Sequence, residues 1–218
     1  MTRIDTQGWK GALVTVTVVG ACGLQLSTAN AAAAKPPPPA PPVAAACQAC
    51  HGSNGEGMVE GDRPRIAGQA AYYLDKQLRD FASGSRQSAI MSPIAKTLSD
   101  ADRAKIVVYF ASLPMPAALA STAPTTAQVS FGRQLAFEGA EAKHVQACDN
   151  CHGPEGSGVT FSGPALAGQL APYLAAQLKS WQQGSRRNDA GSLMSSVAVR
   201  LDDADIAAVT SYYASLGK

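Results

Sequence analysis

The chain has 218 residues, of which 18 are basic and 16 are acidic, giving a net charge of +2 at pH 7. This length suits one large domain or two domains of about 100 residues each. The nearly balanced charge argues against a nucleic-acid-binding protein, which would carry a concentrated basic patch. Aromatic residues make up only 6% of the chain, so a prosthetic group would supply core volume that large side chains usually provide.

Residues 1–31 are typical of a secretory signal peptide, with an apolar segment at 11–26 and an A-x-A-type cleavage site that ends at Ala31. The apolar segment is shorter than the about 20 residues that a membrane-spanning helix needs. Cys22 leaves an alternative open, because the residues before it loosely resemble a lipoprotein cleavage box. The predictions are therefore cleavage after Ala31, a lipid anchor at Cys22, or an uncleaved anchor.

A Pro/Ala-rich leader follows at residues 32–42. Its KPPPPAPP run at 35–42 cannot form helix or sheet, and a proline run makes a stiff, extended spacer. The leader is either inert or a stalk that lifts the first domain off a membrane. A membrane tether through the N-terminus therefore remains one alternative.

The sequence motif Cys-x-x-Cys-His occurs twice, at 47–51 and 148–152. It is the attachment signature of a c-type haem. The two sulfurs lie about one helical turn apart and can form thioethers to one porphyrin, and the histidine is directed at the iron. The predicted thioether residues are Cys47, Cys50, Cys148 and Cys151, and the predicted iron ligands are His51 and His152.

Two other uses of these cysteines are less consistent with the sequence. Zinc sites usually separate their Cys-x-x-Cys pairs by about 15–20 residues, whereas here Cys50 and Cys148 are far apart. A redox-active dithiol could account for one pair, but not for a histidine after both. Because the cysteines are committed to thioethers, no disulfide is expected.

The chain repeats itself with a period near 101 residues. Two units of this length indicate two similar domains rather than a solenoid, which needs more and shorter repeats. We predict two similar domains at 43–113 and 129–218, joined by a linker at 114–128. The repeated segments are Pro64–Gln69 with Pro164–Gln169, Tyr73-Leu74 with Tyr173-Leu174, Gly84–Arg86 with Gly184–Arg186, and Met91-Ser92 with Met194-Ser195.

Helical periodicity is visible in both units, and no convincing strand pattern is present. Apolar spacing predicts helices at about 70–83 and 170–183, closed by Gly84 and Gly184. Last helices begin at Ser99 and Asp202, where each start resembles a capping box. The second unit is predicted to have an opening helix at about 129–138, before its motif. At the equivalent place the first unit has only residues 43–46. The predicted fold is all-α, with two small helical domains that each surround one haem.

The sixth ligand of each iron should occur in both units. Met91 and Met194 are equivalent in the repeat, whereas Met58 and Met115 have no partner. We therefore predict Met91 and Met194 as axial ligands, the alternative being that they fill gaps in the core. His144 precedes the second motif without a repeat partner and is expected to be an exposed helix residue.

Two prolines are candidates for support of the histidines. Pro64 and Pro164 follow His51 and His152 by thirteen and twelve residues. Their carbonyls could accept the ring N–H groups and so fix the orientation of each imidazole. In the alternative, each proline only shapes a loop.

These motifs, in the same order in both units, resemble the di-haem cytochrome c4 family over nearly the whole of 43–113 and 126–218. The resemblance implies tandem class I cytochrome c domains that face each other, with two covalently bound haem c groups whose propionates lie near the domain interface. The ligand pairs that it implies are His51 with Met91 and His152 with Met194. It also implies a periplasmic location, with electrons passed to redox proteins such as an oxidase, a cytochrome bc1-type complex or a dehydrogenase.

Three functions compete on this basis. The first is an electron relay to a terminal oxidase or other respiratory acceptor, with no catalytic residues of its own. The second is the electron-accepting subunit of a periplasmic dehydrogenase, such as a flavin enzyme that oxidises sulfide or an alcohol. The third is a peroxidase, which methionine ligation disfavours because it fills the coordination sphere. The prediction is an electron carrier and not an enzyme.

Overall fold

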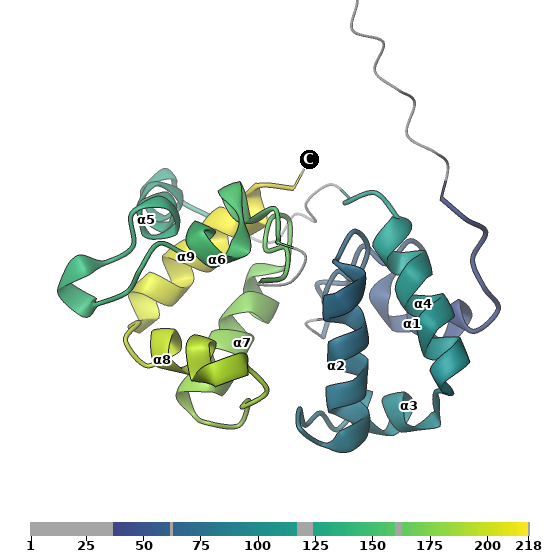
Figure 1. Cartoon of the computed structure of the whole chain (residues 1–218). Helices are drawn as coiled ribbons and strands as arrows, with labels where there is room; N and C mark the ends of the chain where they lie inside the picture. Colours follow the sequence, from purple (N-terminus) through teal and green to yellow (C-terminus); the bar gives the residue numbers. More distant parts are fainter. Residues whose placement is uncertain (1–36, 62, 117–123, 160–162, 218) are drawn as a thin grey trace, which may run out of the picture. The chain divides into compact units, whose positions relative to one another are not determined.

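The computed structural model of the chain describes residues 37–61, 63–116, 124–159 and 163–217 (Figure 1). We call 37–116 the N-terminal lobe and 124–217 the C-terminal lobe. The predicted signal peptide, the lipid-anchor candidate Cys22 and parts of the predicted leader and linker lie outside the described residues. Within the described residues, no helix has the length and apolar character needed to span a membrane.

Both lobes are helical, as predicted. The described residues form only isolated β-bridges and no named strand. The C-terminal lobe also contains three short 3-10 turns, at Glu141–Lys143, Pro154–Gly156 and Ala190–Ser192. The N-terminal lobe contains α1 Ala44–His51, α2 Ala71–Ser83, α3 Met91–Thr97 and α4 Asp100–Ser112. The C-terminal lobe contains α5 Thr126–Phe137, α6 Asp149–His152, α7 Ala171–Gln182, α8 Leu193–Ala198 and α9 Asp203–Ser215.

The helix ends follow local capping chemistry. Gly84 closes α2 in a left-handed conformation with φ of 86°, which glycine adopts without steric cost. The side chain of Ser99 accepts a hydrogen bond from the backbone N–H of Asp102 at the start of α4. Helix α5 begins three residues before the predicted start at 129, because Thr125 and Gln128 form a capping box there.

Each lobe has its own apolar core between its last helix and the segment around its Cys-x-x-Cys-His motif. In the C-terminal lobe, helices α5 and α9 cross closely at Gly132 (Figure 1). The N-terminal core consists of Ala44, Ala67, Ile106, Tyr109, Phe110 and Leu113, with Cys47 packed against it. The C-terminal core consists of Leu135, Ala136, Leu174, Val209, Tyr212 and Tyr213, with Cys148 packed against it.

The close crossing of α5 and α9 has no counterpart among the described residues of the N-terminal lobe. A Cβ atom added to Gly132 would lie 2.1 Å from the carbonyl oxygen of Ala208, so the two backbones nearly touch. The position of α4 that corresponds to Ala208 is Lys105, whose side chain is 60% exposed. The equivalent face of α4 is therefore open to solvent at this position. Instead Ala44, in the first turn of α1, is fully buried against the N-terminal core.

Candidate haem sites and the joint between the lobes

The two motif histidines are buried and held alike. His51 ends α1 and His152 ends α6, and each is 8% exposed. Nδ1 of His51 lies 2.8 Å from the carbonyl oxygen of Pro64, and Nδ1 of His152 lies 3.0 Å from that of Pro164. With Nδ1–H donating to the carbonyl, Nε2 keeps its lone pair for a metal. Burial lowers the pKa of both imidazoles, which favours the neutral, ligating form.

Glycines bring the loop after each motif against the segment that begins at Pro64 or Pro164, which we call the proline segments. The backbone N–H of Gly57 donates to the carbonyl of His51, and that of Gly158 donates to His152, each at 2.7 Å. A Cβ atom at Gly57 would lie 2.8 Å from the backbone nitrogen of Arg65, and one at Gly158 would lie 2.9 Å from that of Ala165. Close backbone approach therefore requires glycine at both positions.

The four motif cysteines are half-buried in the two lobes. Burial raises the pKa of the Cys47 thiol and raises that of Cys148 to about 11. Among the described residues, which include all four cysteines, no three or more His, Cys, Asp or Glu side chains are grouped to hold a metal ion. The zinc-site alternative therefore has no support in the structure.

The two repeat-equivalent methionines lie at the starts of short helices. Met91 is the first residue of α3 and Met194 is the second residue of α8, and both are half-buried. The backbone N–H of Met91 donates to the hydroxyl of Ser88 at 3.0 Å, and that of Ser195 donates to the carboxylate of Asp189 at 2.8 Å. Side chains thus anchor both helix starts.

The unrepeated candidates have other surroundings. The sulfur of Met58 lies 3.7 Å from a guanidinium nitrogen of Arg63, which donates to it. His144 is exposed, but it lies at the end of a 3-10 turn in a left-handed conformation rather than within a helix. The prediction of an exposed His144 is therefore confirmed, and its predicted helical setting is wrong.

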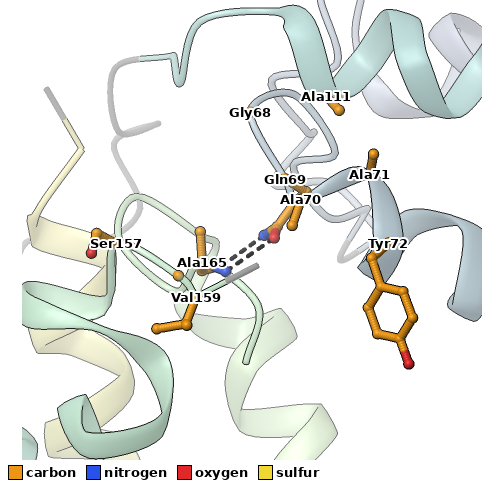
Figure 2. A pocket seen from close by; sticks show the side chains of 10 residues that line it. Gly68, Gln69, Ala70, Ala71, Tyr72, Ala111, Ser157, Val159 and Ala165 are labelled. Carbon is orange, nitrogen blue, oxygen red and sulfur yellow. Dashed lines mark hydrogen bonds between the residues drawn. The ribbon is translucent and has the colours of Figure 1, made fainter. Parts of the chain in front are cut away.

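The lobes are joined by reciprocal hydrogen bonds between a glutamine of one and the backbone of the other. The amide of Gln69 donates to the carbonyl of Ala165 at 2.7 Å and accepts from its N–H at 3.0 Å (Figure 2). The amide of Gln169 donates to the carbonyl of Arg65 at 2.9 Å and accepts from its N–H at 2.8 Å. These two pairs satisfy buried backbone groups of both proline segments.

A second set of cross-lobe hydrogen bonds centres on two buried arginines. Arg86 donates to the hydroxyl of Tyr173 at 3.0 Å and to Gln177 at 2.7 Å, both in the other lobe. Arg186 donates to Gln77 at 3.2 Å in the same reciprocal manner, and its guanidinium reaches the hydroxyl of Tyr73 at 3.5 Å. The repeated Gly-Ser-Arg segments therefore mark the joint, which the sequence alone did not indicate.

The joint between the lobes contains buried hydrogen-bond donors for which the described residues provide too few acceptors. None of the ion pairs between described residues involves Arg65, Arg86 or Arg186, although all three are buried. Nε of Arg65 and Nε1 of Trp181 are buried donors without a hydrogen-bond partner among the residues that the structure describes. Buried cations and donors of this kind require an anionic acceptor. Carboxylate groups such as haem propionates match that requirement, so the residues present fit a haem in each lobe.

A cleft of about 320 Å³ opens beside the Gln69–Ala165 pair (Figure 2). Its lining is mostly small side chains and backbone, with the ring of Tyr72 and the methyl groups of Val159 on its walls. Among these lining residues there is no carboxylate, imidazole or amine. The phenol of Tyr72 is therefore the one ionisable side chain among the printed lining residues.

The fold and the doubled motif define a tandem c-type cytochrome. Residues 42–114 and 138–217 each match the sequence model of cytochrome c. The chain belongs to the cytochrome c family and, within it, to the di-haem cytochromes c4. It is therefore a di-haem electron-transfer protein with two covalently bound haem c groups, which its two Cys-x-x-Cys-His motifs at 47–51 and 148–152 fit.

The relatives carry two kinds of name. The chain is 38% identical to cytochrome c4 of Pseudomonas aeruginosa, covering 91% of this chain and 94% of the relative. It is 42% identical to the thiosulfate dehydrogenase electron acceptor of Stutzerimonas stutzeri, covering 80% of this chain and 81% of the relative. A second thiosulfate dehydrogenase electron acceptor, from Thiomonas intermedia, is 44% identical over 79% of both chains.

The solved structures that resemble this chain likewise include a cytochrome c4 and a thiosulfate dehydrogenase. Reduced cytochrome c4 of Pseudomonas stutzeri superposes with a TM-score of 0.73 at 34% identity, covering 79% of this chain and 94% of that one. A thiosulfate dehydrogenase of Marichromatium purpuratum superposes with a TM-score of 0.69 at 37% identity. That match covers 77% of this chain but 36% of the other, so this chain resembles one part of a longer protein.

Proposed function

We propose that the protein is a periplasmic electron acceptor for a thiosulfate dehydrogenase and passes the electrons on to a respiratory oxidase. The observation that carries this proposal is the likeness to two thiosulfate dehydrogenase electron acceptors, at 42% and 44% identity. The match to part of the Marichromatium purpuratum thiosulfate dehydrogenase supports it, because there a similar segment belongs to the dehydrogenase chain itself.

The proposed iron ligands are His51 with Met91 and His152 with Met194. Bound in this way, each haem exchanges one electron between its ferric and ferrous states. Pro64 and Pro164 hold each imidazole by its Nδ1–H, at the 2.8 Å and 3.0 Å distances given above. This support keeps the ligand from reorienting when the charge on the iron changes.

The protein is proposed to be a carrier and not an enzyme. A histidine and a methionine on each iron would leave no open position for oxygen or peroxide. The lining of the cleft beside the joint contains no carboxylate, imidazole or amine. The substrate chemistry would therefore take place on the dehydrogenase, and this chain would only receive the electrons.

The periplasm is the proposed location. Residues 1–31 read as an export signal in the sequence, and the Pro/Ala-rich leader at 32–42 would separate the first lobe from that segment. Mass measurement of the mature N-terminus decides between cleavage after Ala31 and lipid attachment at Cys22. Fractionation of cells that carry a Cys22→Ser variant provides the matched control for the second alternative.

The test of the partner uses the secreted holoprotein, a purified thiosulfate dehydrogenase and thiosulfate. We expect the ferrous absorption bands to appear only when all three are present, with two electrons taken up per molecule. A dehydrogenase for an unrelated substrate, supplied with that substrate, serves as the control. Equal reduction by both enzymes, or none by the thiosulfate enzyme, would contradict the proposed partner.

A second candidate is a general carrier between a cytochrome bc1-type complex and a terminal oxidase. The full-length likeness to cytochrome c4 of Pseudomonas aeruginosa favours it. Oxidation of the ferrous protein by membranes that contain the oxidase, compared with its reduction by a bc1-type complex, separates the two candidates. Fast reduction by the complex and none by thiosulfate dehydrogenase would favour the general carrier.

A further inference from the structure

Arg65 is the main difference between the two repeats at the joint. Its repeat partner is Ala165, and the two backbones are paired alike, Arg65 with Gln169 and Ala165 with Gln69. Only the N-terminal lobe adds a long cationic side chain at this position. The position lies directly after Pro64, whose carbonyl accepts the hydrogen bond from His51.

The guanidinium of Arg65 is enclosed by both lobes. The residue is 1% exposed, and its side chain is one of the largest fully buried ones. One terminal nitrogen donates to the carbonyl of Ala67 at 2.6 Å in its own lobe, and the other donates to the carbonyl of Ala167 at 2.8 Å in the other lobe. The charge therefore lies between the two segments that follow Pro64 and Pro164.

No described carboxylate neutralises this charge. Arg65 takes part in none of the ion pairs between described residues, and its Nε has no hydrogen-bond partner among them. Burial lowers the pKa of Arg65 to about 10, which still leaves the guanidinium protonated at neutral pH. Two backbone carbonyls compensate only part of a buried positive charge, so its field extends to nearby groups with little screening by solvent.

A cation in this position would act on an iron bound by His51 or His152. Oxidation adds one positive charge to a haem, and a nearby buried cation disfavours that addition. A haem propionate that accepts a hydrogen bond from Nε would shift the reduction potential in the same direction. The guanidinium would neutralise the propionate, and a neutralised propionate stabilises the ferric state less. We propose that Arg65 is a residue that raises the reduction potentials of the haems, through a buried charge that only one repeat carries.

The test compares variants of the secreted di-haem protein by spectroelectrochemical titration. Arg65→Met removes the charge with a side chain of similar reach, Arg65→Gln removes it but keeps hydrogen-bonding groups, and Arg65→Lys keeps it. We expect the sum of the two midpoint potentials to shift downward in both neutral variants and to stay near the wild-type value in Arg65→Lys. Arg79→Met is the matched control, because the side chain of Arg79 is 60% exposed and screened by water.

The outcomes separate a charge effect from a purely mechanical one. If Arg65 only ties the lobes together, all three Arg65 variants shift the potentials alike or leave them unchanged, and the proposal is overturned. Chemical unfolding of each variant reports the loss of the joint independently of the potentials. If Arg65→Met does not fold with two haems, the comparison of Arg65→Gln with Arg65→Lys decides the matter in the same way.

Discussion

Gln69 and Gln169 occupy equivalent positions in the two lobes, and each makes the same two hydrogen bonds to the backbone of the opposite lobe. Both glutamines are 4% exposed, and the four distances lie between 2.7 and 3.0 Å. Each amide satisfies one buried N–H and one buried carbonyl that would otherwise lack a partner. The glutamines therefore specify how the two lobes meet, beyond the energy that each bond contributes.

Replacing Gln69 with alanine should weaken the joint. The change leaves the N–H and carbonyl of Ala165 buried without partners, which costs about 1–3 kcal/mol. We expect a lower denaturant midpoint for the ferric holoprotein. The double variant with Gln169→Ala should lose less than the sum of the single losses, because the first change already loosens the contact.

Gln87→Ala is the control for this prediction, since Gln87 is exposed on the loop after α2. Its denaturant midpoint should match that of the wild type. Strict additivity of the two joint variants would mean that the glutamines act independently rather than as one contact.

Replacing Gly132 with alanine should destabilise the C-terminal lobe. The added methyl carbon would lie 2.1 Å from the carbonyl oxygen of Ala208 and 2.8 Å from Cβ of Tyr212, and backbone cannot move aside locally. Overpacking of this kind costs about 1–3 kcal/mol or more. Thermal unfolding of the holoprotein measures the loss, and Ser130→Ala on the exposed side of α5 is the control. A more stable Gly132→Ala protein would contradict the close crossing.

Asp75 should contribute stability that depends on pH. Partial burial alone would raise its pKa, but hydrogen bonds from Arg79 and Arg103 lower it overall. A carboxylate whose pKa is lowered in the folded state stabilises the fold at pH values above its unfolded-state pKa, which is near 3.8. That contribution disappears as the pH falls through the folded-state pKa. Because its side chain is 34% exposed, the contribution at neutral pH is about 0.5–1 kcal/mol.

The measurement is the difference in unfolding free energy between the wild type and Asp75→Asn, taken from neutral to acidic pH. The difference should be largest near pH 7 and vanish below the folded pKa of Asp75. A difference that stays constant with pH would show that the side chain acts through packing and not through its charge.

Replacing Met91 with alanine should open one iron to external ligands. We expect the ferrous wild type to bind no carbon monoxide and the Met91→Ala protein to bind one molecule, with the absorption band of sulfur ligation reduced by half. Met194→Ala should behave in the same way at the other haem. Met58→Ala is the control, because the sulfur of Met58 already contacts Arg63. Unaltered spectra in Met91→Ala would disprove the proposed ligand.

Much of the local structure could be predicted from the sequence. The stripe of apolar residues and Gly84 locate α2, and the capping residues Ser99 and Asp202 locate the starts of α4 and α9. The short helices α3 and α8 were not predicted, because they are too short for a periodic pattern. The early start of α5 was missed because its capping box lies within a stretch whose composition resembles a linker.

The amino-acid sequence is enough to assign the class of the protein, because covalent haem attachment needs only cysteines and a histidine at fixed local spacing, and this spacing occurs twice. The folded chain was needed to show that the repeated Gln and Gly-Ser-Arg segments connect the two lobes. Their hydrogen-bond partners are about 100 residues away in the chain. For the two glutamines the separations are 96 and 104 residues. Such contacts leave no periodic signal in the sequence. The burial of Arg65 without an acidic partner likewise depends on two lobes enclosing it, so it becomes visible only once the chain is folded.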